Sequence, residues 1–217
     1  MEVITIINKA VTPKKGNKPN FDEAHVLLAL DIINKEQPIG RHLLMKRLNL
    51  SEATTRTLIR RLKELQLINI DKIAGILLTE NGKKIIETLY SLIKIIDEIK
   101  IDTINWETSA LIISNGKSIL DKIGILQMRD LIIKAGAEKV LIAVVENNTL
   151  ELPPKSFNES EEVKKLKNEL KERTERLTKD GDLIIFFEPK GRYLAYKILT
   201  LILEKNGCLF NSKPCGR

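Results

Sequence analysis

Residues 37–82 constrain the fold more than any other part of the sequence, because two short helical patterns meet there at a tight turn. The first pattern covers residues 41–48, and the second begins after Ser51, a residue type favoured at helix N-caps. Apolar or small side chains recur at helical spacing in both patterns, so each helix can bury one face. The residues expected to face inward are Leu43, Leu44, Leu48, Thr55, Leu58, Ile59, Leu62 and Leu65.

Two short strand patterns follow the second helix, at residues 67–71 and 75–78, and residues 79–82 open another helix. Ile39 is placed to form a third short strand beside them. The order of helix, turn, helix and two-stranded wing predicts a winged helix-turn-helix domain over residues 21–82, whose first helix begins near Phe21.

The exposed side of the second helix carries the residues expected to recognise DNA. Arg56 and Arg60 are one helical turn apart, a spacing that suits base edges in a major groove. Four residues are therefore expected to read bases: Thr54, Arg56, Thr57 and Arg60. Five others around the turn and the wing are expected to hold phosphates and set the register: Arg41, Lys46, Arg47, Ser51 and Lys72.

The distribution of charge supports this interpretation. Residues 1–84 carry fifteen basic and nine acidic side chains, a net +6, whereas the remaining 133 residues carry a net +1. Phosphate binding requires such a concentration of positive charge. The alternative is a solvated basic face on an ordinary three-helix domain.

Several segments of the chain also resemble those of a known family. In the N-terminal region they are Phe21–His25, Ile39–Arg41, Arg56–Leu62 and Leu78–Gly82. These segments resemble archaeal winged-helix transcriptional regulators that carry an uncharacterised C-terminal domain, and Met128–Ala137 resembles the signature of that second domain. The resemblance covers about residues 20–205 and implies transcription regulation, without naming a ligand or an operator.

Two features depart from the family pattern. Gln66 stands where a glycine usually precedes the Leu-Ile pair after the reading helix. If Gln66 is left-handed, a side chain there costs about 1 kcal/mol relative to glycine. The wing is short and poor in arginine, which argues against strong contact with a minor groove.

Composition and spacing indicate the structure of the segments that flank the DNA-binding region. Residues 1–20 are expected to be a mobile basic arm that either follows DNA phosphates or frays, with Val3–Ile7 as a possible edge strand. Residues 83–103 are expected to form one long helix, because five apolar residues follow a heptad spacing. They are Ile85, Leu89, Leu92, Ile96 and Ile99. This helix either connects two domains or dimerises, and palindromic operators favour a homodimer.

Residues 104–205 change character, with short apolar runs of strand type alternating with helical patterns. The strands are expected at residues 109–114, 140–145, 150–152 and 182–187, and the helices at 124–135, 159–179 and 192–204. This alternation predicts a small α/β sandwich, and the whole chain is assigned to the α+β class. The domain is expected to sense a small molecule or to mediate assembly.

A small anionic effector is a possible partner of this second domain. Residues 188–192 follow a strand and open a helix, so backbone N–H groups with Lys190, Gly191 and Arg192 suit an anion. Any strand-to-helix loop looks similar, so this remains one alternative. Arg129 and Asp130 are the other candidate effector contacts, with an ordinary ion pair as the alternative.

The sequence offers no credible catalytic set, metal site or cofactor motif. The chain has two histidines, and its two cysteines, Cys208 and Cys215, lie in a polar tail at 206–217 that is expected to be flexible with free thiols. No run of about 18 uncharged apolar residues occurs and no signal-peptide pattern is present, which predicts a cytoplasmic protein that avoids membranes. We therefore expect a non-enzymatic, sequence-specific regulator that binds double-stranded DNA. The alternative is a winged-helix module that binds protein and does not read DNA.

Overall fold

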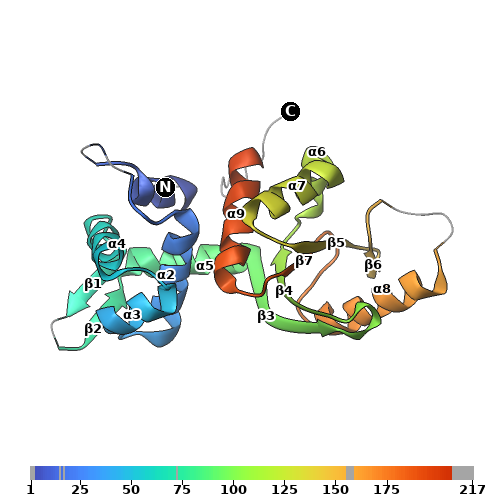
Figure 1. Ribbon diagram of the computed structural model, residues 1–217, viewed down its shortest axis with the longest axis horizontal. Helices are drawn as coiled ribbons and strands as arrows, with labels where there is room; N and C mark the ends of the chain where they lie inside the picture. Colours follow the sequence, from blue (N-terminus) through green and yellow to red (C-terminus); the bar gives the residue numbers. More distant parts are fainter. Residues whose placement is uncertain (1–2, 15, 17, 72, 155–158, 207–217) are drawn as a thin grey trace. The chain divides into compact units, whose positions relative to one another are not determined.

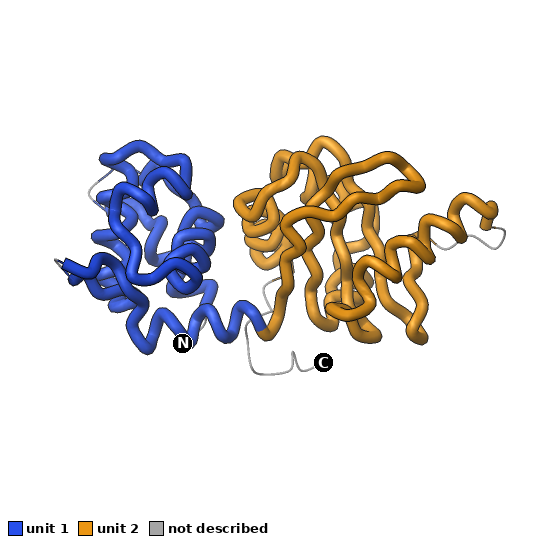
Figure 2. The backbone as a smooth tube through the Cα atoms, turned by 90° about the horizontal axis from the view of Figure 1, so that it is seen from below, with its two compact units in different colours: residues 1–90, 208–217 blue, residues 91–207 orange. Residues whose placement is uncertain are grey.

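The computed structural model describes every residue except 1–2, 15, 17, 72, 155–158 and 207–217. The expectations for Lys72, Cys208 and Cys215 therefore lie outside the described residues. The chain divides into two compact units, and the boundary falls between Tyr90 and Ser91 (Figure 2).

The first unit consists mainly of helices with one β-hairpin. Its elements are α1 (Val3–Val11), α2 (Glu23–Glu36), α3 (Arg41–Leu48), α4 (Glu52–Glu64), β1 (Ile68–Asp71), β2 (Gly75–Leu78) and most of α5 (Glu80–Leu92). Asn49 ends α3 in the left-handed conformation, and the Ser51 side chain caps α4 by accepting from the Thr54 N–H. Ile39 and Ile76 exchange two backbone hydrogen bonds, so the predicted short strand beside the hairpin is confirmed. The predicted order of elements from α3 to β2 is present.

The N-terminal segment differs from the sequence prediction. Residues 3–11 form helix α1, which contacts α2 and α4, so the edge strand proposed for Val3–Ile7 is wrong. The apolar residues that face the core recur at helical spacing: Val3, Ile7, Ala10 and Val11. Arg61 on α4 is buried and donates from Nη1 to the carbonyls of Ala10 and Thr12. This anchoring contradicts a mobile arm for the helical part of residues 1–20.

The long helix predicted for residues 83–103 is also wrong. Helix α5 ends at Leu92, and Ile93–Ile101 form strand β3, which pairs antiparallel with β4 (Trp106–Ile113). The segment has isoleucine at five of its nine positions, a composition that favours strands. The strand register is irregular between Ile96 and Ile99, where the isoleucine spacing departs from two-residue alternation.

The second unit is built on a five-stranded sheet with strand order β3-β4-β7-β5-β6, in which every neighbouring pair is antiparallel. The remaining elements are η1 (Asp102–Ile104), α6 (Lys117–Ile123), α7 (Ile125–Ala135), β5 (Lys139–Glu146), β6 (Thr149–Glu151), α8 (Glu161–Thr174), β7 (Leu183–Glu188) and α9 (Arg192–Asn206). All the strands and helices predicted for this region are present, although α8 ends at Thr174 and α6 was not predicted.

Helices cover both faces of this sheet, with α7 and α9 on one side and α8 on the other (Figure 1). Leu170 of α8 packs on a buried cluster that includes Ala110, Ile112, Ile184 and Phe186. Alternate residues of the same strands, among them Leu111 and Ile185, point to the opposite face. The sheet is therefore buried on both faces, and the predicted α+β fold with a C-terminal sandwich is confirmed.

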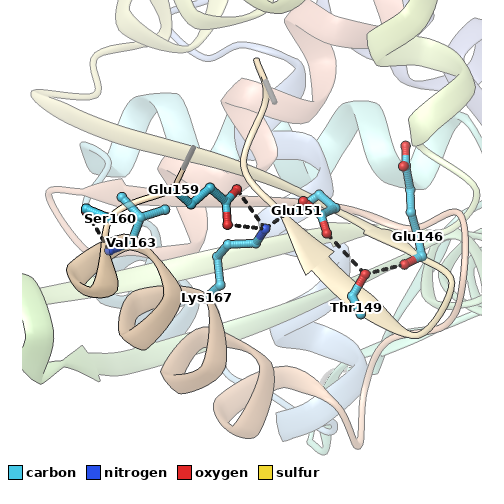
Figure 3. Close-up of polar contacts among 7 residues, drawn as sticks. All are labelled: Glu146, Thr149, Glu151, Glu159, Ser160, Val163 and Lys167. Carbon is cyan, nitrogen blue, oxygen red and sulfur yellow. Dashed lines mark hydrogen bonds and ion pairs between the residues drawn. The ribbon is translucent and has the colours of Figure 1, made fainter. Parts of the chain in front are cut away.

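A lysine fixes α8 to the edge of the sheet. Lys167 points between Glu151 of β6 and Glu159, with Nζ–Oε distances of 2.6 and 3.0 Å (Figure 3). Burial lowers the pKa of Lys167, but hydrogen bonds to the two carboxylates outweigh it, and the pKa is raised overall. Two carboxylates thus face one ammonium group, and the contacts hold β6 against α8.

Candidate DNA-binding interface

Helix α4 is oriented by its apolar face. Thr55, Leu58, Ile59 and Leu62 are buried, as the spacing predicted, while Leu65 is half-buried. Of the inward residues expected on α3, Leu44 and Leu48 are buried, but Leu43 keeps 44% of its surface exposed. Because one side of α4 packs on the unit, its other side is presented to solvent.

The four residues expected to read bases lie together on this outer side. Arg56 and Arg60 are exposed, and Thr54 and Thr57 are half-buried. The Thr57 hydroxyl donates to the Ala53 carbonyl at 3.0 Å, and the Thr54 hydroxyl lies 2.8 Å from the Ser51 hydroxyl. The arginines thus supply the long, reaching donors, and the threonines offer short side chains near the start of the helix.

An acidic residue organises the arginines of this surface. Glu52 accepts from Arg56 Nη2 at 2.7 Å and lies 3.4 Å from Arg41 Nη2, so one carboxylate faces two guanidinium groups. The Arg56 and Glu52 side chains are 59% and 57% exposed, and exposed pairs of this kind contribute at most about 1 kcal/mol. A DNA phosphate or base can therefore compete for Arg56. No role for Glu52 was predicted from the sequence.

The basic side of α4 forms one wall of a hollow of about 660 Å³. The start of α3 and the β1–β2 hairpin form the other walls. The basic residues that line it are Arg41, His42, Arg56, Arg60 and Lys63. His42 and Lys63 were not among the predicted site residues. Lys63 could have been found from spacing, since residues 56, 60 and 63 follow one another along a single helical face.

The hairpin is held beside this hollow by a glycine and an aspartate. Gly75 has φ 115° and a Cβ there would lie 2.8 Å from the Ile39 carbonyl oxygen, so only glycine fits. The Asp71 carboxylate accepts from the N–H groups of Ala74 and Ile73, each at 2.7 Å, and these bonds lower its pKa. The tip of the hairpin exposes Ile73 almost completely.

The described residues that are expected to hold phosphates differ in how their side chains are engaged. Arg41, Lys46, Arg47 and Ser51 are exposed. Arg47 forms an ion pair with Glu36 at 3.2 Å, and the Ser51 hydroxyl also caps α4. By contrast, Arg61 is only 5% exposed and serves to anchor α1, although its position in the sequence gives it the same basic character.

The predicted effector residues are divided between two elements of the second unit. Arg192 forms a two-point pair with Asp97, at 2.6 and 2.7 Å, and Lys190 lies 2.5 Å from Glu98 and 3.2 Å from Glu107. Glu98 and Glu107 raise the pKa of Lys190. Both cations thus already have carboxylate partners. An anion would have to displace them. The Gly191 N–H donates to the Ser109 hydroxyl.

Arg129 and Asp130 lie exposed on α7. Neither takes part in an ion pair given for the described residues, so the structure does not test an effector role for them. The effector assignment as a whole stays a prediction.

The geometry defines a helix-turn-helix domain with an exposed cationic face on α4, followed by a second unit in which Lys190 and Arg192 are paired with carboxylates. Residues 27–93 match the family model of the CggR N-terminal DNA binding domain, and residues 104–205 match a domain of unknown function, DUF4443. The first match supports a DNA-binding regulator, with the DNA-binding part in the N-terminal unit. Together the two matches support the resemblance as far as a DNA-binding N-terminal domain and an uncharacterised C-terminal domain, whereas its archaeal and winged-helix parts stay predictions.

A solved structure has a similar fold. It is titled a hypothetical protein from Pyrococcus horikoshii OT3, is 26% identical, and aligns with a TM-score of 0.58 over 83% of this chain and 91% of that one. No curated protein matches the sequence significantly. In the part of the chain that the structure describes, no helix is long and apolar enough to span a membrane.

Proposed function

We propose that the protein is a sequence-specific transcription regulator that places α4 in the major groove of double-stranded DNA. Arg56 and Arg60, with Thr54 and Thr57, read base edges. Arg41, Lys46, Arg47, Ser51 and Lys72 hold the flanking phosphates. One observation carries the proposal, namely the exposed arginine pair on the outer face of a helix whose opposite face is fully used in packing.

The hollow beside α4 supports the same orientation. Five basic side chains line it and its acidic residue, Asp71, is turned to the backbone of the hairpin tip. A polyanion is the partner that such a surface suits. The hairpin then lies along the duplex as a short wing, completing a winged helix-turn-helix.

The second unit is proposed to sense a small molecule or to mediate assembly, and the protein is proposed to act as a homodimer on a two-fold operator. The predicted dimerisation helix does not exist as one element, since α5 gives way to β3. The case for a dimer therefore depends on the symmetry of operators alone.

A protein-binding module is the second candidate function. The exposed apolar residues of the β1–β2 hairpin favour it. Ile73 is 99% exposed and Ile70 is 43% exposed, so the tip presents apolar surface beside the basic hollow. A partner protein would use this apolar surface, whereas DNA binding depends on the cations of α4 and α3.

The salt dependence of duplex binding distinguishes the two functions. Fragments selected from the source genome are titrated with the protein by fluorescence anisotropy at increasing salt. A DNA-binding surface loses affinity steeply, and Lys46→Ala reduces the slope of log K against log[salt] by about 1 on every sequence. Binding that is weak and insensitive to salt would contradict the proposed function and favour the protein-binding alternative.

A further inference from the structure

A second hollow lies in the N-terminal unit, away from the cationic face of α4. It has a volume of about 500 Å³ and is lined by α1, by the last residues of α4 and by the first half of α5. Sites for small molecules usually have volumes of about 300–1,000 Å³. The hollow is therefore large enough for a small organic ligand.

The lining combines apolar and cationic side chains. Val3, Leu67 and Ile85 are buried and supply apolar surface from three different elements. Lys9 of α1 and Lys84 of α5 also line the hollow and are exposed. Apolar walls with a few convergent polar groups are typical of ligand sites.

The two lysines are the groups whose charge is left unmatched. Among the described residues, neither Lys9 nor Lys84 has a carboxylate within salt-bridge distance. The acid that shares their hollow, Glu64, is 2.6 Å from Lys14, which lowers the pKa of Glu64. The charge facing a ligand is consequently positive.

We propose that this hollow binds a small carboxylate with an apolar body, of the aliphatic or aromatic acid class. The apolar body packs on Val3, Leu67 and Ile85, and the carboxylate accepts from the ammonium groups of Lys9 and Lys84. Such charge-assisted hydrogen bonds are roughly twice as strong as neutral ones, which selects an anionic head over a neutral one.

The position of the hollow connects it to the reading helix. Glu64 and Leu65 end α4 and line the hollow. Arg61 ties α4 to the carbonyl of Ala10 in α1 and to that of Thr12, which follows α1. A ligand that joins α1 to α5 therefore also contacts the end of α4. Regulation of DNA affinity by this route rests on the proposed function, whereas ligand binding does not.

Ligand binding is tested directly on the full chain, with decanoate and benzoate as probes. Methyl signals of Val3, Leu67 and Ile85 are followed by NMR, and affinities are measured by calorimetry. Wild type is expected to bind decanoate, and Lys9→Gln and Lys84→Gln are each expected to weaken it by at least about tenfold. Lys83→Gln is the matched control, because Lys83 is paired with Glu80 at 2.8 Å and does not line the hollow.

Three outcomes would overturn the site. They are no shift of these methyl signals with either acid, unchanged affinity in both lysine variants, and equal binding of decanol and decanoate. The DNA arm is measured separately, as the change in duplex affinity when decanoate is added. If the protein binds decanoate but does not bind duplex DNA, the proposed function fails while the ligand site stands.

Discussion

The two units of this protein use positive charge in opposite ways. On α4 of the first unit, Arg60 is exposed and Arg56 shares a single exposed carboxylate, Glu52, with Arg41. At the start of α9 in the second unit, Lys190 and Arg192 face three carboxylates from β3 and β4. The same residue types thus form an open surface in one unit and a set of matched internal pairs in the other.

A basic residue therefore indicates a binding surface only when its neighbours leave its charge unmatched. The carboxylates Asp97 and Glu98 lie where the β3–β4 register is irregular and reach the loop before α9. Among the described residues, neither Arg60 nor Lys63 forms an ion pair. Substitutions that remove charge should therefore change DNA affinity in one unit and stability in the other.

The largest expected effect is on DNA recognition. Arg56→Ala and Arg60→Ala should each lose about 1–3 kcal/mol of binding free energy on the operator and relax one base preference, because each removes a base contact. Affinities for operator and random duplex are compared by anisotropy, with Arg192→Ala as the control from the other unit. Equal losses on both duplexes would contradict a base-reading role.

The residues that end α4 and α7 differ in a second way, which should change the free energy of unfolding by about 1 kcal/mol. Gln66 after α4 and Gly136 after α7 are both left-handed, with φ of 57° and 112°. Each donates to the carbonyl three residues back, and the next residue donates to the carbonyl five back. Gln66→Gly should stabilise the protein by up to about 1 kcal/mol, whereas Gly136→Ala should destabilise it by about as much. Urea unfolding measures both, and equal signs would contradict this account.

Removing a matched cation should affect stability and leave DNA binding unchanged. Arg192→Ala breaks the two-point pair with Asp97. The two side chains are 26% and 59% exposed, respectively. The expected loss is at most about 1 kcal/mol, since solvent screens the pair. Thermal and urea unfolding provide the measurement. A loss of duplex affinity at unchanged stability would reverse the proposed roles of the two units.

Glu52→Gln should strengthen DNA binding modestly. The substitution releases Arg56 and Arg41 from their shared carboxylate and removes a negative charge from a surface that faces phosphates. An increase of about two- to fivefold is expected on all duplexes at low salt, and it should shrink as salt rises. Glu23→Gln, at the start of α2, serves as the charge-matched control. Weaker binding by Glu52→Gln would show that Glu52 positions Arg56 productively.

The smallest effect is confined to the hairpin tip at acid pH. Hydrogen bonds from Ala74 and Ile73 lower the pKa of Asp71 relative to about 3.9 in an unfolded chain. The folded pKa is the lower one. The stability that these hydrogen bonds contribute is therefore fully present above the unfolded pKa and is lost as pH falls through the folded pKa. The amide signals of Ile73 and Ala74 should therefore titrate below pH 3.9 or so, and a midpoint above that value would contradict the hydrogen bonds.

Much of the DNA-binding region was predictable because its signals are local. The Ser51 cap, the tight turn before it and the inward stripe of α4 depend on residues within a few positions of each other, and each was expected from spacing or residue type. Arg61 was not predictable. Its neighbours are as basic as Arg56 and Arg60, and only the packing of α1 decides that this arginine is buried.

By itself the sequence determined the helices and strands in which the spacing of apolar residues and the residues at the ends indicate the same element. It also determined the side of α4 that faces solvent. Tertiary structure decided residues 93–101, because five isoleucines satisfy both a helical and a strand spacing until β4 supplies a partner. It also decided which carboxylates pair with the cations at the start of α9, since Arg192 meets Asp97 from 95 residues away. Contacts between distant segments have no local signal, and they alone separate the open cations of this protein from the matched ones.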